Sequence, residues 1–147
     1  MSKQDEAALI LKLYSLRREP TMRIARDWYF RDFDPKSLAD FNAAMFSEHS
    51  GHLRMVLSYW DMAAALVNNG AIGLDFFNDC NGEHIGVFAK IEPLLGEVRA
   101  AYSPRFGASL EKLIDDTPDG RKTVAAHREH MKKIQAQMEQ RQQAAKG

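Results

Sequence analysis

Apolar residues recur at helical spacing along most of the chain, in segments that prolines and glycines separate. The first segment, residues 5–18, places Leu9, Leu13 and Leu16 on one face, at the three- and four-residue steps of a helix. The next segment, 20–32, opens with a proline, which a first helical position tolerates. Nowhere do apolar and polar residues alternate over a long enough run to indicate a half-buried strand. The pattern therefore predicts an all-α protein.

The most apolar segment, residues 51–69, predicts the central helix of the fold. Its apolar positions cover most of the helix circumference, which is typical of a helix surrounded by others. Gly70 ends this segment, and either Ser47 or Ser50 can cap its start. We expect large side chains of this helix and its neighbours to form the core: Trp28, Phe41, Leu57, Trp60, Phe88 and Leu95.

Two dipeptides, Asp34-Pro35 and Thr117-Pro118, each combine an N-cap residue with a proline and predict further helix starts. Between them, the apolar period runs unbroken through residues 83–102, which predicts one helix kinked at Pro93 or two abutting helices. Residues 71–82 are irregular and predict a short helical turn followed by a loop. Together the segments predict a compact bundle of about six to eight helices.

The last segment, residues 118–145, differs from the others because few of its positions are apolar. Those few follow steps of three and four residues, as in the narrow seam of a coiled coil. A helix of this length extends about 40 Å, so it can project from the bundle. We divide the chain into a helical domain at 1–117 and an amphipathic helix at 118–147 that is not an independent domain. The predicted oligomer interface consists of Val124, His127, Met131, Ile134 and Met138.

Composition excludes several classes of protein. The 147 residues carry 20 basic and 20 acidic side chains, and this balance argues against a nucleic-acid binder. One cysteine forms neither an internal disulfide nor a thiolate zinc site. The longest purely apolar run, Met62 to Val67, is far shorter than the roughly 20 residues that span a bilayer. With its polar first residues, the sequence predicts a cytoplasmic protein that binds no membrane and needs no cofactor.

A polar line crosses the otherwise apolar segment 51–69. Arg54, Ser58 and Asp61 share one face of that helix, with apolar side chains on both flanks. Neighbouring helices must crowd such a face, and a shielded charge is tolerated only when it is paired. We expect Asp61 to meet an arginine of the second helix and Arg54 to meet a carboxylate such as Glu83. The alternative interpretation is an ordinary solvent-exposed face.

The loop before residue 84 gathers oxygen-bearing side chains, and Cys80 lies there, close in sequence to His84. Calcium favours such oxygen density, but the register does not fit an EF-hand, so turn chemistry is the better interpretation. A nucleophilic cysteine needs a base and an orienting partner, and no third residue accompanies this pair. The polar line and this loop supply the candidate pocket residues: Arg54, Asp61, Asp79, Glu83 and His84.

Two histidine pairs, His49 with His52 and His127 with His130, have i, i+3 spacing on predicted helices. Two imidazoles at that spacing can share a metal, but the pattern is not the His-Glu-x-x-His spacing of a specific site. A polar first turn and a polar seam position explain them better. We therefore predict no metal site.

Two stretches carry a family resemblance: Leu13-Tyr14-Ser15-Leu16-Arg17-Arg18-Glu19-Pro20, continued by Arg23, Ala25, Arg26 and Trp28, and Ser58-Tyr59-Trp60-Asp61-Met62-Ala63-Ala64. In these stretches the sequence resembles a family of small uncharacterised bacterial all-helical proteins with no assigned activity. The resemblance implies a bacterial cytoplasmic helical protein and carries over no catalytic residue.

Two functions from different classes remain open at this point. The first is a non-enzymatic interaction module that self-associates, or binds a helical protein partner, through the C-terminal seam. The second is a small-molecule-binding protein or enzyme with a polar pocket between helices. The surroundings of Arg54 and Asp61 distinguish the two, because only the second requires them to line a cavity.

Overall fold

The computed structural model describes residues 2–147, which form helices and no strands. The all-α prediction is confirmed, together with the long C-terminal helix. In chain order the helices are α1 (Lys3–Arg17), α2 (Pro20–Arg31), α3 (Leu38–Met45), α4 (Ser50–Asn68), α5 (Leu74–Cys80), α6 (Glu83–Ile91), the 3₁₀ helix η1 (Glu92–Leu94), α7 (Leu95–Ala101), α8 (Ala108–Asp116) and α9 (Gly120–Lys146).

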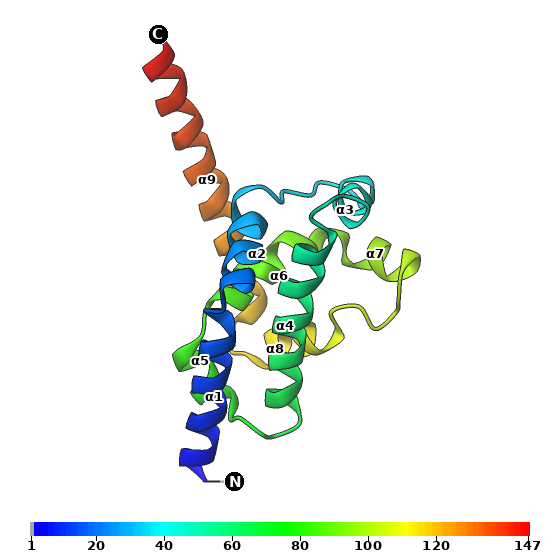
Figure 1. The fold of residues 1–147 in the computed structure, drawn as a ribbon, viewed down its shortest axis with the longest axis vertical. Helices are drawn as coiled ribbons and strands as arrows, with labels where there is room; N and C mark the ends of the chain where they lie inside the picture. Colours follow the sequence, from blue (N-terminus) through cyan, green and yellow to red (C-terminus); the bar gives the residue numbers. More distant parts are fainter. Residues whose placement is uncertain (1) are drawn as a thin grey trace.

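Helix α4 lies at the centre of the bundle, as predicted, and packs against α2, α3, α5, α6 and α8 (Figure 1). Gly70 ends it in the left-handed conformation, with a φ of 84°, that residues with a Cβ rarely adopt. All six side chains expected in the core are buried. Burial of this apolar surface from several helices at once is the main force holding the bundle together.

Of the three helix starts predicted at prolines, the one at Pro20 is correct and those at the two dipeptides are wrong. Helix α2 begins at Pro20, and the Glu19 carboxylate accepts the Met22 N–H at 3.1 Å. The Asp34-Pro35 prediction is wrong, because α3 begins at Leu38 and the hydroxyl of its N-cap, Ser37, accepts the Asp40 N–H.

The start predicted at Thr117-Pro118 is also wrong, because α9 begins at Gly120. The chain turns there through Asp119, whose φ is 55°, and passes close to the end of α8. An added Cβ at Gly120 would lie 1.9 Å from the Ile114 carbonyl oxygen. This close approach to the backbone sets the start of α9.

The continuous period through residues 83–102 is divided in the structure. Pro93 lies within the 3₁₀ helix η1, between α6 and α7. Proline has no N–H to donate to the preceding turn, so the interruption falls where the sequence places the kink. The second alternative, two abutting helices, describes this region better than one kinked helix.

Helix α9 begins inside the bundle and ends outside it. Its first turns pack on α6 and α8, and Val124 is fully buried. An added Cβ at Gly86 would lie 2.9 Å from His127 Nε2, so a small residue in α6 is what lets α9 approach closely. Beyond His130 the helix extends away from the other helices, and the chain termini lie at opposite ends of the molecule (Figure 1).

Candidate functional site

An open cleft of about 530 Å³ lies beside α4, against α3, the end of α6, α8 and the connection from α7 to α8. Its floor is apolar and consists of side chains that are themselves buried, including Phe41, Leu57 and Leu110. The polar line of α4 lies along its edge. The residues that line it are Phe41, Met45, Arg54, Leu57, Ser58, Asp61, Ile91, Tyr102, Ser103, Arg105, Phe106, Gly107 and Leu110.

Asp61 stabilises the start of α8 from the neighbouring helix. Its Oδ1 accepts the Leu110 N–H at 2.9 Å, in the first turn of α8. The N-cap of α8 is Gly107, which has no side chain to offer that turn. A carboxylate at a helix N-terminus pairs with unsatisfied N–H groups and with the positive end of the helix dipole. The expected partner, an arginine of the second helix, is wrong.

Arg54 lies on the exposed edge of the cleft and forms no ion pair with any residue of 2–147. The expected pairing with Glu83 is also wrong, since Arg26 takes that carboxylate. Arg26 Nη2 lies 2.6 Å from Glu83 Oε1, and its Nε also donates to Glu83. A second exposed guanidinium in the cleft, that of Arg105, likewise lacks a carboxylate partner within the described chain.

Glu83 and His84 lie deeper in the bundle and do not line this cleft. Glu83 also accepts the indole N–H of Trp60 at 3.1 Å, so one carboxylate joins α2, α4 and α6. His84 is 1% exposed and packs against Trp60 and Phe77, and neither ring nitrogen has a hydrogen-bond partner among the described residues. Burial lowers the pKa of His84 to about 4, which keeps its imidazole neutral at pH 7.

Asp79 is exposed at the end of α5, as is Cys80, and the two lie outside the cleft. Cys80 is exposed whereas His84 is buried, so the arrangement does not suit a nucleophile and its base. In residues 2–147 no group of three or more His, Cys, Asp or Glu side chains is placed to hold a metal ion. The loop therefore has the features of a turn between α5 and α6.

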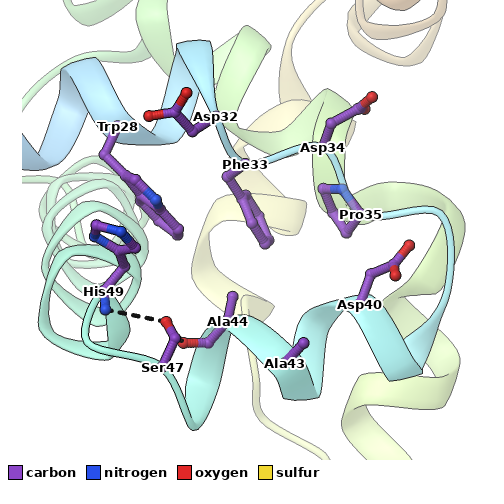
Figure 2. Close-up of a pocket in the computed structure, with 10 residues that line it drawn as sticks. All are labelled: Trp28, Asp32, Phe33, Asp34, Pro35, Asp40, Ala43, Ala44, Ser47 and His49. Atoms are coloured by element: carbon purple, nitrogen blue, oxygen red, sulfur yellow. Dashed lines mark hydrogen bonds between the residues drawn. The ribbon is translucent and has the colours of Figure 1, made fainter.

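A smaller hollow of about 300 Å³ lies between the end of α2, α3 and the start of α4 (Figure 2). Trp28 stacks on His49 there, with ring centroids 5.2 Å apart, and Asp34 points away from that stack. Lys36 engages two carboxylates of the rim, through its Nζ to Asp34 and its backbone N–H to Asp40. The rings in this hollow are stacked and its Asp34 and Asp40 carboxylates are already hydrogen-bonded, as at a packed junction between helices.

Polar contacts anchor the first turns of α9, which sequence periodicity did not reveal. Arg121 bonds to three carboxylates, Glu92, Glu111 and Asp115, at 2.6–2.8 Å. Arg128 bonds to Glu92 at 2.6 Å and to the Ala89 carbonyl oxygen. These contacts join α9 to η1, α6 and α8, and they end at Arg128.

The predicted interface residues of α9 divide at the edge of the bundle. Val124 is fully buried, and His127 is half-buried, with a pKa lowered first by burial and then by His130 and Lys90. Met131 is 39% exposed and Met138 56% exposed, and Ile134 lies between them, partly exposed. Along the seam, exposure is thus lowest at Val124 and highest at Met138.

The cleft contains residues that sequence reasoning missed. Tyr102, Arg105 and Phe106 line it from the connection between α7 and α8. Periodicity identifies helix faces, but it does not show that Tyr102, at the end of the period through 83–102, and Arg105 and Phe106, beside Pro104, face the same cleft. Their placement depends on how α7 and α8 pack. A charged residue beside a proline, Arg105, was the one feature of the sequence that could have indicated a binding residue in this connection.

Together these features define an all-helical domain with an open cleft and a long C-terminal helix. Within that class, the chain belongs to the family described as Domain of unknown function (DUF4760), which matches residues 5–117. No curated protein and no solved structure matches it. The matched region includes the whole cleft and ends before α9 begins. No helix in residues 2–147 is both long and apolar enough to cross a membrane.

Proposed function

We propose that this protein is a non-enzymatic interaction module that pairs with a second copy of itself through the outer part of α9. The observation that carries this proposal is the seam of Met131, Ile134 and Met138, which continues the buried Val124 and the half-buried His127 along α9. The family resemblance of the N-terminal helices supports a bacterial cytoplasmic setting.

The residues beside the outer seam favour self-pairing. In a heptad pattern with Met131 and Met138 at equivalent positions, the flanking positions are Gln135, Gln137, Gln142 and Ala144. None of these is charged, so two identical helices meet no like-charge repulsion there. The next seam position is Arg141, which ends the apolar contact and predicts a weak, reversible dimer.

A second copy also offers α9 the packing that its own bundle does not. The last anchoring contacts are those of Arg128, and the helix continues to Lys146. Isolated helices of this length are only marginally stable in water, and burial of an apolar stripe is what usually stabilises them. Pairing in a coiled coil supplies that burial for Met131, Ile134 and Met138.

Sedimentation velocity over a range of protein concentrations tests the proposal. We expect the full chain to shift from monomer to dimer as concentration rises. The double variant Met131→Lys/Met138→Lys should stay monomeric, because two like charges would face each other across the seam. The matched control Ala136→Lys/Gln140→Lys adds the same charge outside the seam and should dimerise as the wild type does.

Two results would contradict the proposal. A wild-type chain that remains monomeric at the highest concentration would exclude self-association. Equal loss of dimer in the seam variant and the control would show that charge, and not the seam, governs the mass.

A further inference from the structure

We propose that the cleft beside α4 binds a small organic anion, with an apolar body on the cleft floor and a carboxylate at the guanidinium groups of Arg54 and Arg105. This site is separate from the outer seam of α9, so the proposal does not depend on dimerisation.

The shape and lining of the cleft suit a small molecule. Its volume of about 530 Å³ lies within the range of small-molecule sites in proteins, roughly 300–1,000 Å³. Phe41, Leu57, Ile91 and Leu110 form a floor that is already buried within the fold. An aliphatic or aromatic body in the cleft covers the apolar lining that is still accessible to water, which includes Met45, Tyr102 and Phe106.

The charges at the edge of the cleft select an anion. Arg54 and Arg105 have no carboxylate partner in the described chain, whereas Arg26, Arg99 and Arg121 each have at least one. The one carboxylate in the cleft, that of Asp61, already accepts the Leu110 N–H. An organic cation would therefore be repelled by two guanidinium groups, and the carboxylate in the cleft is already hydrogen-bonded.

A carboxylate matches these arginines in shape as well as in charge. A guanidinium presents a planar fork of N–H donors that matches the two oxygens of a carboxylate. Inorganic phosphate meets the same charge but leaves the apolar floor uncovered. The ligand class is therefore a monocarboxylate with an apolar body rather than a free anion.

Hydrogen bonds hold the walls of the cleft in place before any ligand arrives. The Tyr102 hydroxyl donates to Asn42 Oδ1 and so links the end of α7 to α3. Arg99 Nε donates to the Phe106 carbonyl oxygen at 2.8 Å and fixes the connection that carries Arg105. A preformed wall lowers the ordering cost of binding, which favours ligand affinity.

Isothermal titration calorimetry of the full chain tests the proposal, with octanoate as the probe and octylammonium and acetate as comparisons. We expect octanoate to bind, and the two comparisons to bind at least about tenfold more weakly. Octylammonium shares the apolar body but has the opposite charge, and acetate has the carboxylate without the body.

Two double variants locate the binding. Arg54→Gln/Arg105→Gln should weaken octanoate binding by about tenfold or more. The control Arg18→Gln/Arg23→Gln removes two exposed arginines outside the cleft and should leave the affinity unchanged. Both variants should melt at the wild-type temperature, because neither cleft arginine is in an ion pair within residues 2–147.

Three results would overturn the proposal. They are the absence of octanoate binding to the wild type, equal binding of octanoate and octylammonium, and octanoate binding that the Arg54→Gln/Arg105→Gln variant leaves unchanged. The second would indicate adhesion to apolar surface alone, and the third would place the anion elsewhere. Nuclear magnetic resonance shifts confined to α4 and the α7–α8 connection are the expected supporting signal.

Discussion

At the scale of the residue, the sequence neighbours Glu83 and His84 are both shielded from solvent, but they differ in their hydrogen-bond partners. Glu83 accepts hydrogen bonds from Arg26 and Trp60, so its charge is compensated. The adjacent His84 is enclosed by aromatic rings and has no hydrogen-bond partner within residues 2–147. A buried imidazole without a partner remains neutral, since protonation would place a charge in an apolar site.

This burial predicts a fold that weakens in mild acid. The unfolded chain protonates His84 near its ordinary pKa of 6.5, whereas the folded chain does so only near 4. Between those values the unfolded state binds more protons, so stability falls as the pH decreases, by up to about 3 kcal/mol. His127, whose pKa is also lowered, acts in the same direction.

Urea unfolding at pH 7, 5.5 and 4.5 checks the prediction for His84. The variant His84→Leu cannot titrate, and we expect it to lose less stability over this range than the wild type. Identical pH slopes for the two proteins would show that His84 does not cause the loss. Carboxylates with lowered pKa, such as Glu92 and Glu111, contribute mainly below this window.

A second prediction at this scale concerns Asp61 and the start of α8. Asp61→Ala removes the side chain that accepts the Leu110 N–H and should lower the free energy of unfolding by about 1 kcal/mol. Asp61→Asn keeps an oxygen acceptor, so its effect should be smaller. Chemical denaturation of both variants measures this order, and equal losses would argue that charge matters more than the hydrogen bond.

At the scale of the element, the sequence predicted which segments form helices more securely than it predicted the residues at which those helices begin. Local spacing identifies which residues can share an apolar face, and the helices of Figure 1 occupy those segments. A proline fixes only its own φ and restricts the residue before it. Whether it then opens a helix, as Pro20 does, or precedes one, as Pro35 does, depends on tertiary packing.

In the candidate site, too, one part follows from helical spacing and another part depends on tertiary packing. The polar line of Arg54, Ser58 and Asp61 follows from helical spacing, and all three residues line the cleft. Their partners could not be predicted, because the Leu110 N–H and the Arg105 side chain arrive from an irregular connection. Sequence spacing fixes faces within a helix, whereas the opposing face is set by the packing of other elements.

Three helical glycines, in α4, α6 and α9, predict a ranked response to alanine. Gly120→Ala places a Cβ 1.9 Å from a backbone oxygen of α8 and should cost about 1–3 kcal/mol. Gly86→Ala meets the His127 side chain, which can move, so its cost should be smaller. Gly51→Ala meets nothing within 4 Å and should be neutral or stabilising, because alanine favours helix.

Guanidinium chloride unfolding of the three variants gives the order. A result in which Gly51→Ala destabilises the fold most would contradict the close approach of α9 to α6 and α8 at Gly86 and Gly120. A stable Gly120→Ala would show that the start of α9 can shift away from Ile114 at little cost.

At the scale of the whole molecule, the inner turns of α9 pack on the bundle and its outer turns project from it (Figure 1). The division of the chain at residue 117 is therefore a proposal that truncation can test. The inner turns contribute Val124 to the core and Arg121 to a network of three carboxylates. In the outer turns Met131 and Met138 are exposed, and this end of α9 extends away from the other labelled helices (Figure 1). We therefore expect the part of α9 that stabilises the bundle to end near His130, although the family match ends at 117.

The last prediction follows from that difference. A chain that ends at His130 keeps Val124, Arg121 and Arg128, so its thermal unfolding should match that of the full chain at low concentration, where both are monomeric. A chain that ends at Asp116 exposes the apolar surface that Val124 covers and leaves Glu92, Glu111 and Asp115 without Arg121. Its melting temperature should fall by several degrees or more. Circular dichroism melts measure both, and an unchanged melting temperature after removal of residues 117–147 would show that 1–116 folds independently and that α9 only rests on its surface.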